Sequence, residues 1–215
     1  MLFNSAIFVL LFIAVYSVYW FLPIRGKHYL IIVASLLFYS WYSVPFLILF
    51  LALIIVNYLV SLALLKKKSA LLLSLTVGLD LAVLGFFKYF YLLAHTIGWA
   101  LGIPYMEHLR ANWEADYDIV IILPIAISFY TFQIIAYVVD TYRGVISEPL
   151  APRRFFVFIL FFPQFVAGPI LRSEDFIPQI DSPTIDQDRM RRGILLLIQG
   201  TIKKVLIADN LGKFT

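Results

Sequence analysis

The sequence contains no cysteine, which excludes disulfide bonds and thiol chemistry within its 215 residues. It is also poor in charge, because Asp, Glu, Lys and Arg make up only 14% of it, against about 25% in a typical soluble domain. Histidine occurs three times. No cluster of metal ligands, no glycine-rich phosphate loop and no Ser/His/Asp arrangement of usable spacing is present. The sequence therefore predicts no metal site and no complete active site.

Apolar residues are in excess: 62% of the chain is hydrophobic and 17% is aromatic. A single soluble core of this size could not bury so much apolar surface. A helical span needs roughly 20 apolar residues, and the uninterrupted apolar runs are typical of helices rather than of alternating barrel strands. We predict an all-α, polytopic membrane protein with about 5–7 transmembrane or re-entrant helices.

The apolar runs locate the membrane segments within a single domain over residues 1–215. Full spans are expected near 3–24, 29–44, 45–65, 69–93 and 119–142, a broken or re-entrant segment at 155–171, and an amphipathic or short spanning helix at 193–208. The net charge is +4, and the basic residues lie at the ends of alternate apolar runs. This distribution argues against nucleic-acid binding and places the N-terminus outside and the basic loops in the cytoplasm.

The run 155–171 disturbs this alternation. It has only 17 residues, and a full crossing would place Arg172 and three further arginines outside. We favour a re-entrant path over a full crossing, and both remain open. Gly168 and Pro169 would then bend the backbone along a cavity wall, with Arg172 at the cytoplasmic mouth.

Two ionisable residues interrupt the apolar segment 69–93. Asp80 and Lys88 could belong to a cavity or a relay, as intramembrane charges often do. Alternatively, Asp80 makes a buried ion pair or a helix–helix hydrogen bond, and Lys88 reaches toward the interface. Gly78 and Gly85, which would let a neighbouring helix approach closely, favour the second interpretation.

The segment 123–144 carries a polar stripe. At 100° per residue, an arc of about 100° contains Tyr130, Gln133, Tyr137, Asp140, Thr141 and Gly144. Such a stripe faces the interior of a helix bundle, where it touches either substrate or other helices. The predicted substrate-binding or cavity-lining residues are Gln133, Tyr137, Asp140, Gly168, Pro169 and Arg172.

Acyl transfer to an alcohol needs a base, and histidine is the usual one. His28 lies in a loop, His95 at the end of a span and His108 in an acidic stretch. None lies in a segment with a partner that would orient it, so we predict no catalytic residue among them.

Three ordered motifs carry a family resemblance: LPIAISFYTFQIIAYVVDTYRG (123–144), FFPQFVAGPILRSEDFIPQI (161–180) and GTIKKVLIADNL (200–211). In order and spacing they resemble the membrane-bound O-acyltransferase family, nearest to its bacterial alginate O-acetyltransferase type. The opening MLFNSAIFVLLF and SLLFYSWY are similar to that type as well. The catalytic histidine of this family lies in a later Trp-His-Gly motif, so the resemblance implies an N-terminal part, inactive alone, whose catalytic residue lies beyond Thr215.

The resemblance also implies a reaction. A cytoplasmic donor, acetyl-CoA or a similar compound acting as substrate rather than as a bound cofactor, would acetylate hydroxyls of an extracytoplasmic polysaccharide, as in alginate biosynthesis. Such enzymes usually work with a periplasmic or extracellular acetyltransferase partner, and the expected location is the lipid bilayer of a bacterial inner membrane. Arg172 could meet an anionic part of the donor. The alternatives are a transporter-like protein and a membrane module without catalysis.

Overall fold

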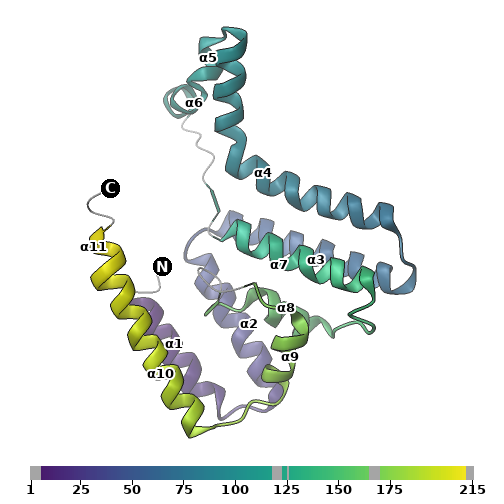
Figure 1. Ribbon diagram of the computed structural model, residues 1–215, viewed down its shortest axis with the longest axis vertical. Coiled ribbons are helices and arrows are strands. Elements are labelled where there is room, and N and C mark those ends of the chain that lie inside the picture. Colours follow the sequence, from purple (N-terminus) through teal and green to yellow (C-terminus); the bar gives the residue numbers. More distant parts are fainter. Residues whose placement is uncertain (1–5, 118–122, 125, 165–169, 212–215) are drawn as a thin grey trace.

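Figure 1 shows the computed structural model, which describes residues 6–117, 123–124, 126–164 and 170–211. All regular secondary structure in these ranges is helical, which confirms the all-α prediction. The elements are α1 (Ala6–Tyr19), α2 (Ile24–Ser40), α3 (Val44–Lys66), α4 (Ala70–Leu101), α5 (Pro104–Glu107), α6 (Leu109–Tyr117), α7 (Ile127–Arg143), α8 (Pro152–Leu160), α9 (Ser173–Asp181), α10 (Gln187–Ile202), a π-helical turn (Lys203–Ala208) and α11 (Asp209–Leu211).

Two helices in the described part of the chain, α3 and α4, are long and apolar enough to cross a membrane. Helix α4 has 32 residues, about 48 Å measured along its axis, which exceeds the roughly 30 Å of a bilayer core, and it bends partway along (Figure 1). It continues past the predicted end at residue 93, and His95 therefore lies inside the helix rather than at its end. The membrane crossings remain predictions.

The core forms where α3, α7 and α8 meet. The rings of Phe50 and Tyr130 lie 4.1 Å apart between centroids, and Phe155 lies 4.7 Å from Tyr137 and 5.0 Å from Tyr58. Figure 1 shows α3 and α7 side by side, with α4 along one flank and α2, α8 and α9 on the other. Aromatic side chains thus fill the centre of the bundle.

The polar stripe of α7 lies inside this bundle, as predicted. Its buried members are Tyr130, Gln133, Tyr137, Asp140 and Thr141. Gly144 is the exception, because it is exposed and ends the helix in a left-handed conformation with φ of 82°.

Helix α8 has nine residues, about 14 Å of helix, which is too short to cross a bilayer. After it ends, the buried amide of Phe162 donates a hydrogen bond to Ser35 Oγ, in the middle of α2, at 3.2 Å. Arg154, in the first turn of α8, contacts Asp181, the last residue of α9, at 2.9 Å. The start of α8 therefore lies beside the end of α9, and the re-entrant path of the run 155–171 remains a prediction. Gly168 and Pro169 lie outside the described residues.

Helix α10 begins at Gln187, earlier than the predicted start at 193, because Asp186 caps it by accepting hydrogen bonds from the amides of Asp188 and Arg189. It lies beside α1, where the Tyr16 hydroxyl donates to Met190 Sδ at 3.6 Å. None of its residues is buried. Its predicted position at the membrane surface remains a prediction.

The interpretation of Asp80 as a helix–helix contact is confirmed, since Asn57 Nδ2 on α3 donates a hydrogen bond to it at 2.9 Å. Lys88 is exposed and lies over the ring of its neighbour Tyr89, and its reach toward the interface stays a prediction. The role given to Gly78 and Gly85 was wrong, because a Cβ atom added at either would meet no described atom within 4 Å. Both glycines lie on a face of α4 that no described helix approaches.

Candidate functional site

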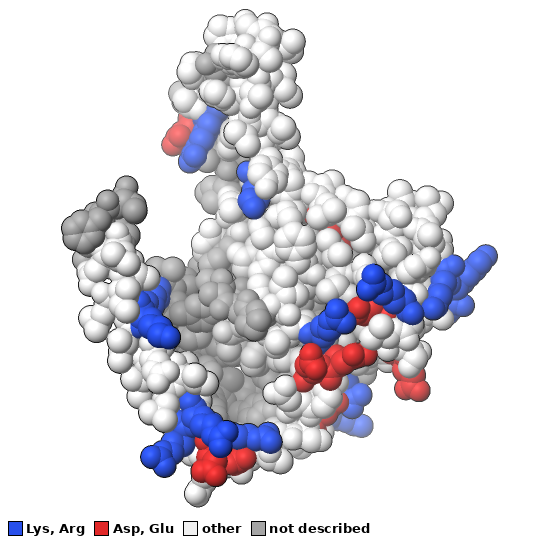
Figure 2. Space-filling view, in the orientation of Figure 1, with Lys and Arg blue, Asp and Glu red and all other residues white. Residues whose placement is uncertain are grey.

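Basic side chains gather at the right-hand and lower edges of the face in Figure 2, with acidic side chains among them, and most of the surface between is uncharged. The right-hand edge includes the turn between α3 and α4 and the end of α7. These two places are in contact, because the Lys68 ammonium nitrogen lies 3.0 Å from the position that a Cβ at Gly144 would occupy. We call this region the basic end of the bundle.

Two of the predicted site residues meet at the basic end. Asp140, in the last turn of α7, lies 4.0 Å from the guanidinium of Arg172, which directly precedes α9. The Asp140 side chain is 10% exposed, whereas that of Arg172 is 61% exposed. One side of the guanidinium therefore faces the Asp140 carboxylate at the distance of a loose ion pair, and its N–H donors are open to an anion.

The end of α7 holds Asp140 in place. The amides of Val145 and Ile146 donate to the Asp140 carbonyl at 3.0 and 3.3 Å, and the left-handed Gly144 lets the chain reverse there. A helix C-terminus carries partial negative charge, and Lys68 beside Gly144 complements it. The cations of the basic end therefore also stabilise the element that carries Asp140.

The other two described members of the predicted set contact neighbouring helices. Gln133 Nε2 donates to the Phe158 carbonyl at 2.9 Å. The Tyr137 ring packs on Phe155 and Phe158. The structure thus brings together Asp140 and Arg172, while Gln133 and Tyr137 hold α8 against α7.

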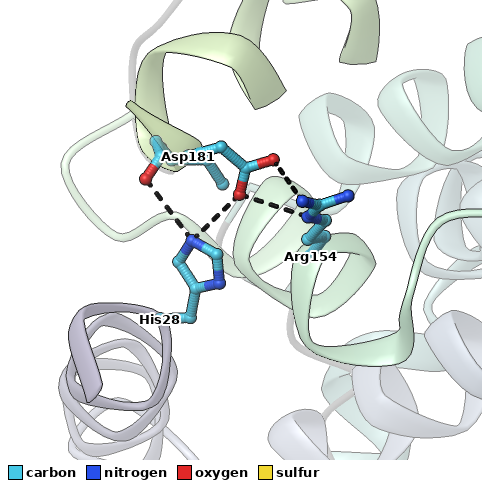
Figure 3. Close-up of polar contacts among 4 residues, drawn as sticks. His28, Arg154 and Asp181 are labelled. Atoms are coloured by element: carbon cyan, nitrogen blue, oxygen red, sulfur yellow. Dashed lines mark hydrogen bonds and ion pairs between the residues drawn. The ribbon is translucent and has the colours of Figure 1, made fainter. Parts of the chain in front are cut away.

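A second polar cluster, shown in Figure 3, joins three helices. Asp181 accepts from Arg154 through both oxygens, at 3.1 Å from Nε and 2.9 Å from Nη2. His28 Nε2, on α2, lies 3.4 Å from Asp181 Oδ1 and 3.4 Å from the Ile180 carbonyl. The cluster ties α2, α8 and α9 together.

The expectation that His28 has no orienting partner was wrong, because Asp181 lies next to it. His28 precedes the predicted span 29–44 and is 1% exposed. Burial lowers the pKa of its imidazole; the Ile180 carbonyl and Asp181 oppose this shift, and the nearby arginine charges add to it. The neutral ring donates through Nε2, and its buried Nδ1 has no hydrogen-bond partner. Since His28 is enclosed, it cannot reach a substrate, and its role is structural.

The other two histidines line a cavity of about 330 Å³ at the far end of α4. His95 and His108 share it with Tyr91, Arg110 and Glu114, and the Arg110 guanidinium lies over the Tyr91 ring at 5.8 Å. In the described ranges, no three His, Asp or Glu side chains come together as a metal site.

Sequence reasoning found Asp140 and Arg172 but missed Asp181, Arg154 and Ser35. Each of these three contacts a residue distant in the sequence. The only local signal was a charge beside an apolar run.

The model of the MBOAT family, membrane-bound O-acyltransferases, matches residues 62–215. The chain is 35% identical to the probable alginate O-acetylase AlgI of Pseudomonas putida, over 98% of this chain and 43% of that protein. The AlgI of Azotobacter vinelandii gives 35% identity over 98% of this chain and 42% of its own length. The peptidoglycan O-acetyltransferase of Helicobacter pylori gives 32% identity over the whole chain and 46% of its own length.

No solved structure matches this chain. The chain spans 39–46% of the length of the curated relatives that it matches. The family match covers more than half of the chain. This protein therefore belongs to the membrane-bound O-acyltransferase family.

Proposed function

We propose that this chain is the N-terminal part of an enzyme that transfers an acetyl group to hydroxyls of an extracytoplasmic polysaccharide. The observation that carries the proposal is the family match together with similarity to alginate and peptidoglycan O-acetyltransferases along almost the whole chain. Both named acceptors are glycan polymers outside the cytoplasm, so a glycan is the proposed acceptor class. The proposed location is the inner membrane of a bacterium, with an extracytoplasmic acetyltransferase as partner.

The experiment compares cells that express the full-length protein with cells that lack its gene. We expect acetyl esters on the exported glycan to disappear with the gene and to return on complementation. Unchanged esters would contradict the proposal. Loss of the exported glycan itself, with normal esters on what remains, would instead favour a transporter-like protein.

We further propose that the basic end of the bundle faces the cytoplasm, that the N-terminus lies outside, and that the run 155–171, which begins within α8, is re-entrant. Arg154 directly precedes this run, and its contact with Asp181 at the end of α9 supports this path, as does the short length of α8. In the turn after α8, the Phe162 amide donates to Ser35 within the bundle, so protein rather than lipid satisfies this backbone group.

Because the chain has no cysteine, single cysteines can report the side of the membrane. Ser173 is buried, so its exposed neighbour Glu174 is the better position. We expect Glu174→Cys to react with an impermeant thiol reagent only from the cytoplasm. Trp99→Cys, at an exposed position near the end of α4, should react only from outside. Labelling of Glu174→Cys from outside alone would contradict the re-entrant path.

At the basic end, we propose that Arg172 binds an anionic group of the acyl donor and that Asp140 positions it. Acetyl-CoA fits this role as a substrate, because its phosphates match the guanidinium donors. The exposed side chain of Arg172 and its loose ion pair with Asp140 support this assignment. Gln133 and Tyr137 would act indirectly, by holding α8 in place beside the site.

This assignment is tested in the full-length enzyme with Arg172→Gln. A charge-assisted hydrogen bond contributes about 1.5–3 kcal/mol, and because Arg172 is exposed we expect the lower end, a roughly tenfold higher KM for the donor. Arg172→Lys should recover part of this loss. The matched control is Arg189→Gln, which removes another exposed, acid-paired arginine. An unchanged donor KM in Arg172→Gln at equal protein abundance would contradict the assignment.

A further inference from the structure

Asn57 and Asp80 face each other halfway along the hairpin formed by α3 and α4. Asn57 lies nine residues before the end of α3 at Lys66, and Asp80 lies ten residues after the start of α4 at Ala70. Both are therefore about 14–15 Å from the connecting turn, close to half of a bilayer core of about 30 Å. Their exposed fractions are 0% and 2%, so neither can be solvated by water outside the bundle.

The hydrogen bonds of this pair are incomplete if Asp80 is ionised. Asn57 Nδ2 donates to Asp80 Oδ1 at 2.9 Å and to the Leu53 carbonyl at 3.0 Å. The two remaining oxygens, Asn57 Oδ1 and Asp80 Oδ2, are buried and have no hydrogen-bond partner. Within the described residues, no Lys, Arg or His side chain forms an ion pair with Asp80.

A single proton on Asp80 accounts for both oxygens that lack a partner. An ionised carboxylate can only accept, whereas a protonated one also carries an O–H donor. A proton on Asp80 Oδ2 removes the buried charge, which is costly without a counterion, and gives Asn57 Oδ1 a donor. The protonated acid can then return a hydrogen bond to the amide whose hydrogen bond it accepts.

We infer that Asp80 is a proton-binding site in the middle of the membrane, where the neutral acid and the Asn57 amide lock α3 against α4. This inference goes beyond the proposed acyl transfer and does not depend on it. The lock fixes the register of the hairpin, whose turn places Lys68 beside Gly144 at the basic end. The occupant is a proton; a monovalent cation held by the two oxygens is the rival that the experiment excludes.

The test is infrared difference spectroscopy on the purified full-length protein at neutral pH. We expect wild type minus Asp80→Asn to contain the carbonyl stretching band of a protonated carboxylic acid, shifted on transfer to heavy water. Asp186→Asn is the matched control, because Asp186 is an exposed aspartate that caps α10. This variant should remove only carboxylate bands. A difference for Asp80→Asn confined to carboxylate bands would overturn the inference.

Thermal stability gives a second, independent readout. An asparagine at position 80 supplies one N–H donor and one carbonyl acceptor toward Asn57, so Asp80→Asn should melt at or above the wild-type temperature. Asn57→Leu leaves the acid without a partner and should melt lower than Asp80→Asn. Equal loss in both variants would contradict the neutral pair. A wild-type melting temperature that rises with sodium relative to choline, and does not rise in Asp80→Asn, would show a cation site instead and overturn the inference.

Discussion

Asp181 is the carboxylate that joins α2, α8 and α9, so its removal tests the packing of the proposed re-entrant segment. Asp181→Asn keeps the shape of the side chain but removes the charge that two Arg154 nitrogens contact at 3.1 and 2.9 Å. Such charge-assisted bonds contribute about 1.5–3 kcal/mol. The side chains of Arg154 and Asp181 are 39% and 22% exposed, and solvent screening reduces the total to about 1–2 kcal/mol. This corresponds to a fall in melting temperature of about 2–8 °C for 150–250 residues, and we expect about half of that for the longer full-length protein.

The assay heats the full-length protein in detergent and measures the fraction that remains monodisperse. Asp186→Asn is the matched control, because asparagine caps a helix as well as aspartate does, and its melting temperature should stay within about 1 °C of wild type. Combined with Arg154→Gln, Asp181→Asn should lower stability by less than the sum of the two single changes. If the losses of stability in the two single variants simply added, or if Asp181→Asn melted like the control, Asp181 would not be the residue that connects α2, α8 and α9.

Three further stability predictions follow from single contacts. Burial lowers the pKa of His28, so below about pH 6.5 the unfolded chain binds a proton that the folded chain does not. Acidification from pH 7.5 to below pH 6.5 should therefore destabilise the wild type more than His28→Gln. Gly144 has a φ of 82°, so Gly144→Ala should cost about 1–2 kcal/mol, whereas Gly85→Ala, in open space within a helix, should cost nothing. Ser35→Ala leaves the buried amide after α8 without its acceptor and should cost about 1–3 kcal/mol, while the exposed Ser40→Ala should change the melting temperature little. Each comparison uses the same heating assay. Equal changes in melting temperature for the two proteins compared would contradict the role given to that residue.

The sequence predicted the features that depend on local periodicity. Apolar runs predicted an all-helical chain, and the arc of polar residues on α7 predicted which face of that helix is buried. Asp140, a buried member in the last turn of α7, could be selected because the period continues to the end of the helix. Arg172 could be selected because it is the first charge after a long apolar run.

The sequence could not predict which residues meet across the bundle. His28 and Asp181 lie at opposite ends of the sequence, and only the path of α8 and α9 brings them to 3.4 Å. Likewise, the apolar segment around Asp80 predicts a contact with another helix but does not identify Asn57 as its partner. Gly78 and Gly85 were misinterpreted because a small residue permits a close approach without requiring one.

The central claim is that this family member passes an acetyl group from a cytoplasmic donor to a glycan on the other side of the membrane. The direct measurement uses vesicles of known orientation that contain the full-length protein, with labelled acetyl-CoA added outside. Inverted vesicles, which expose the cytoplasmic face to the donor, should acetylate enclosed glycan, and vesicles that contain only residues 1–215 should not. Equal acetylation by right-side-out vesicles, or none by intact inverted vesicles that hold protein and acceptor, would contradict the account.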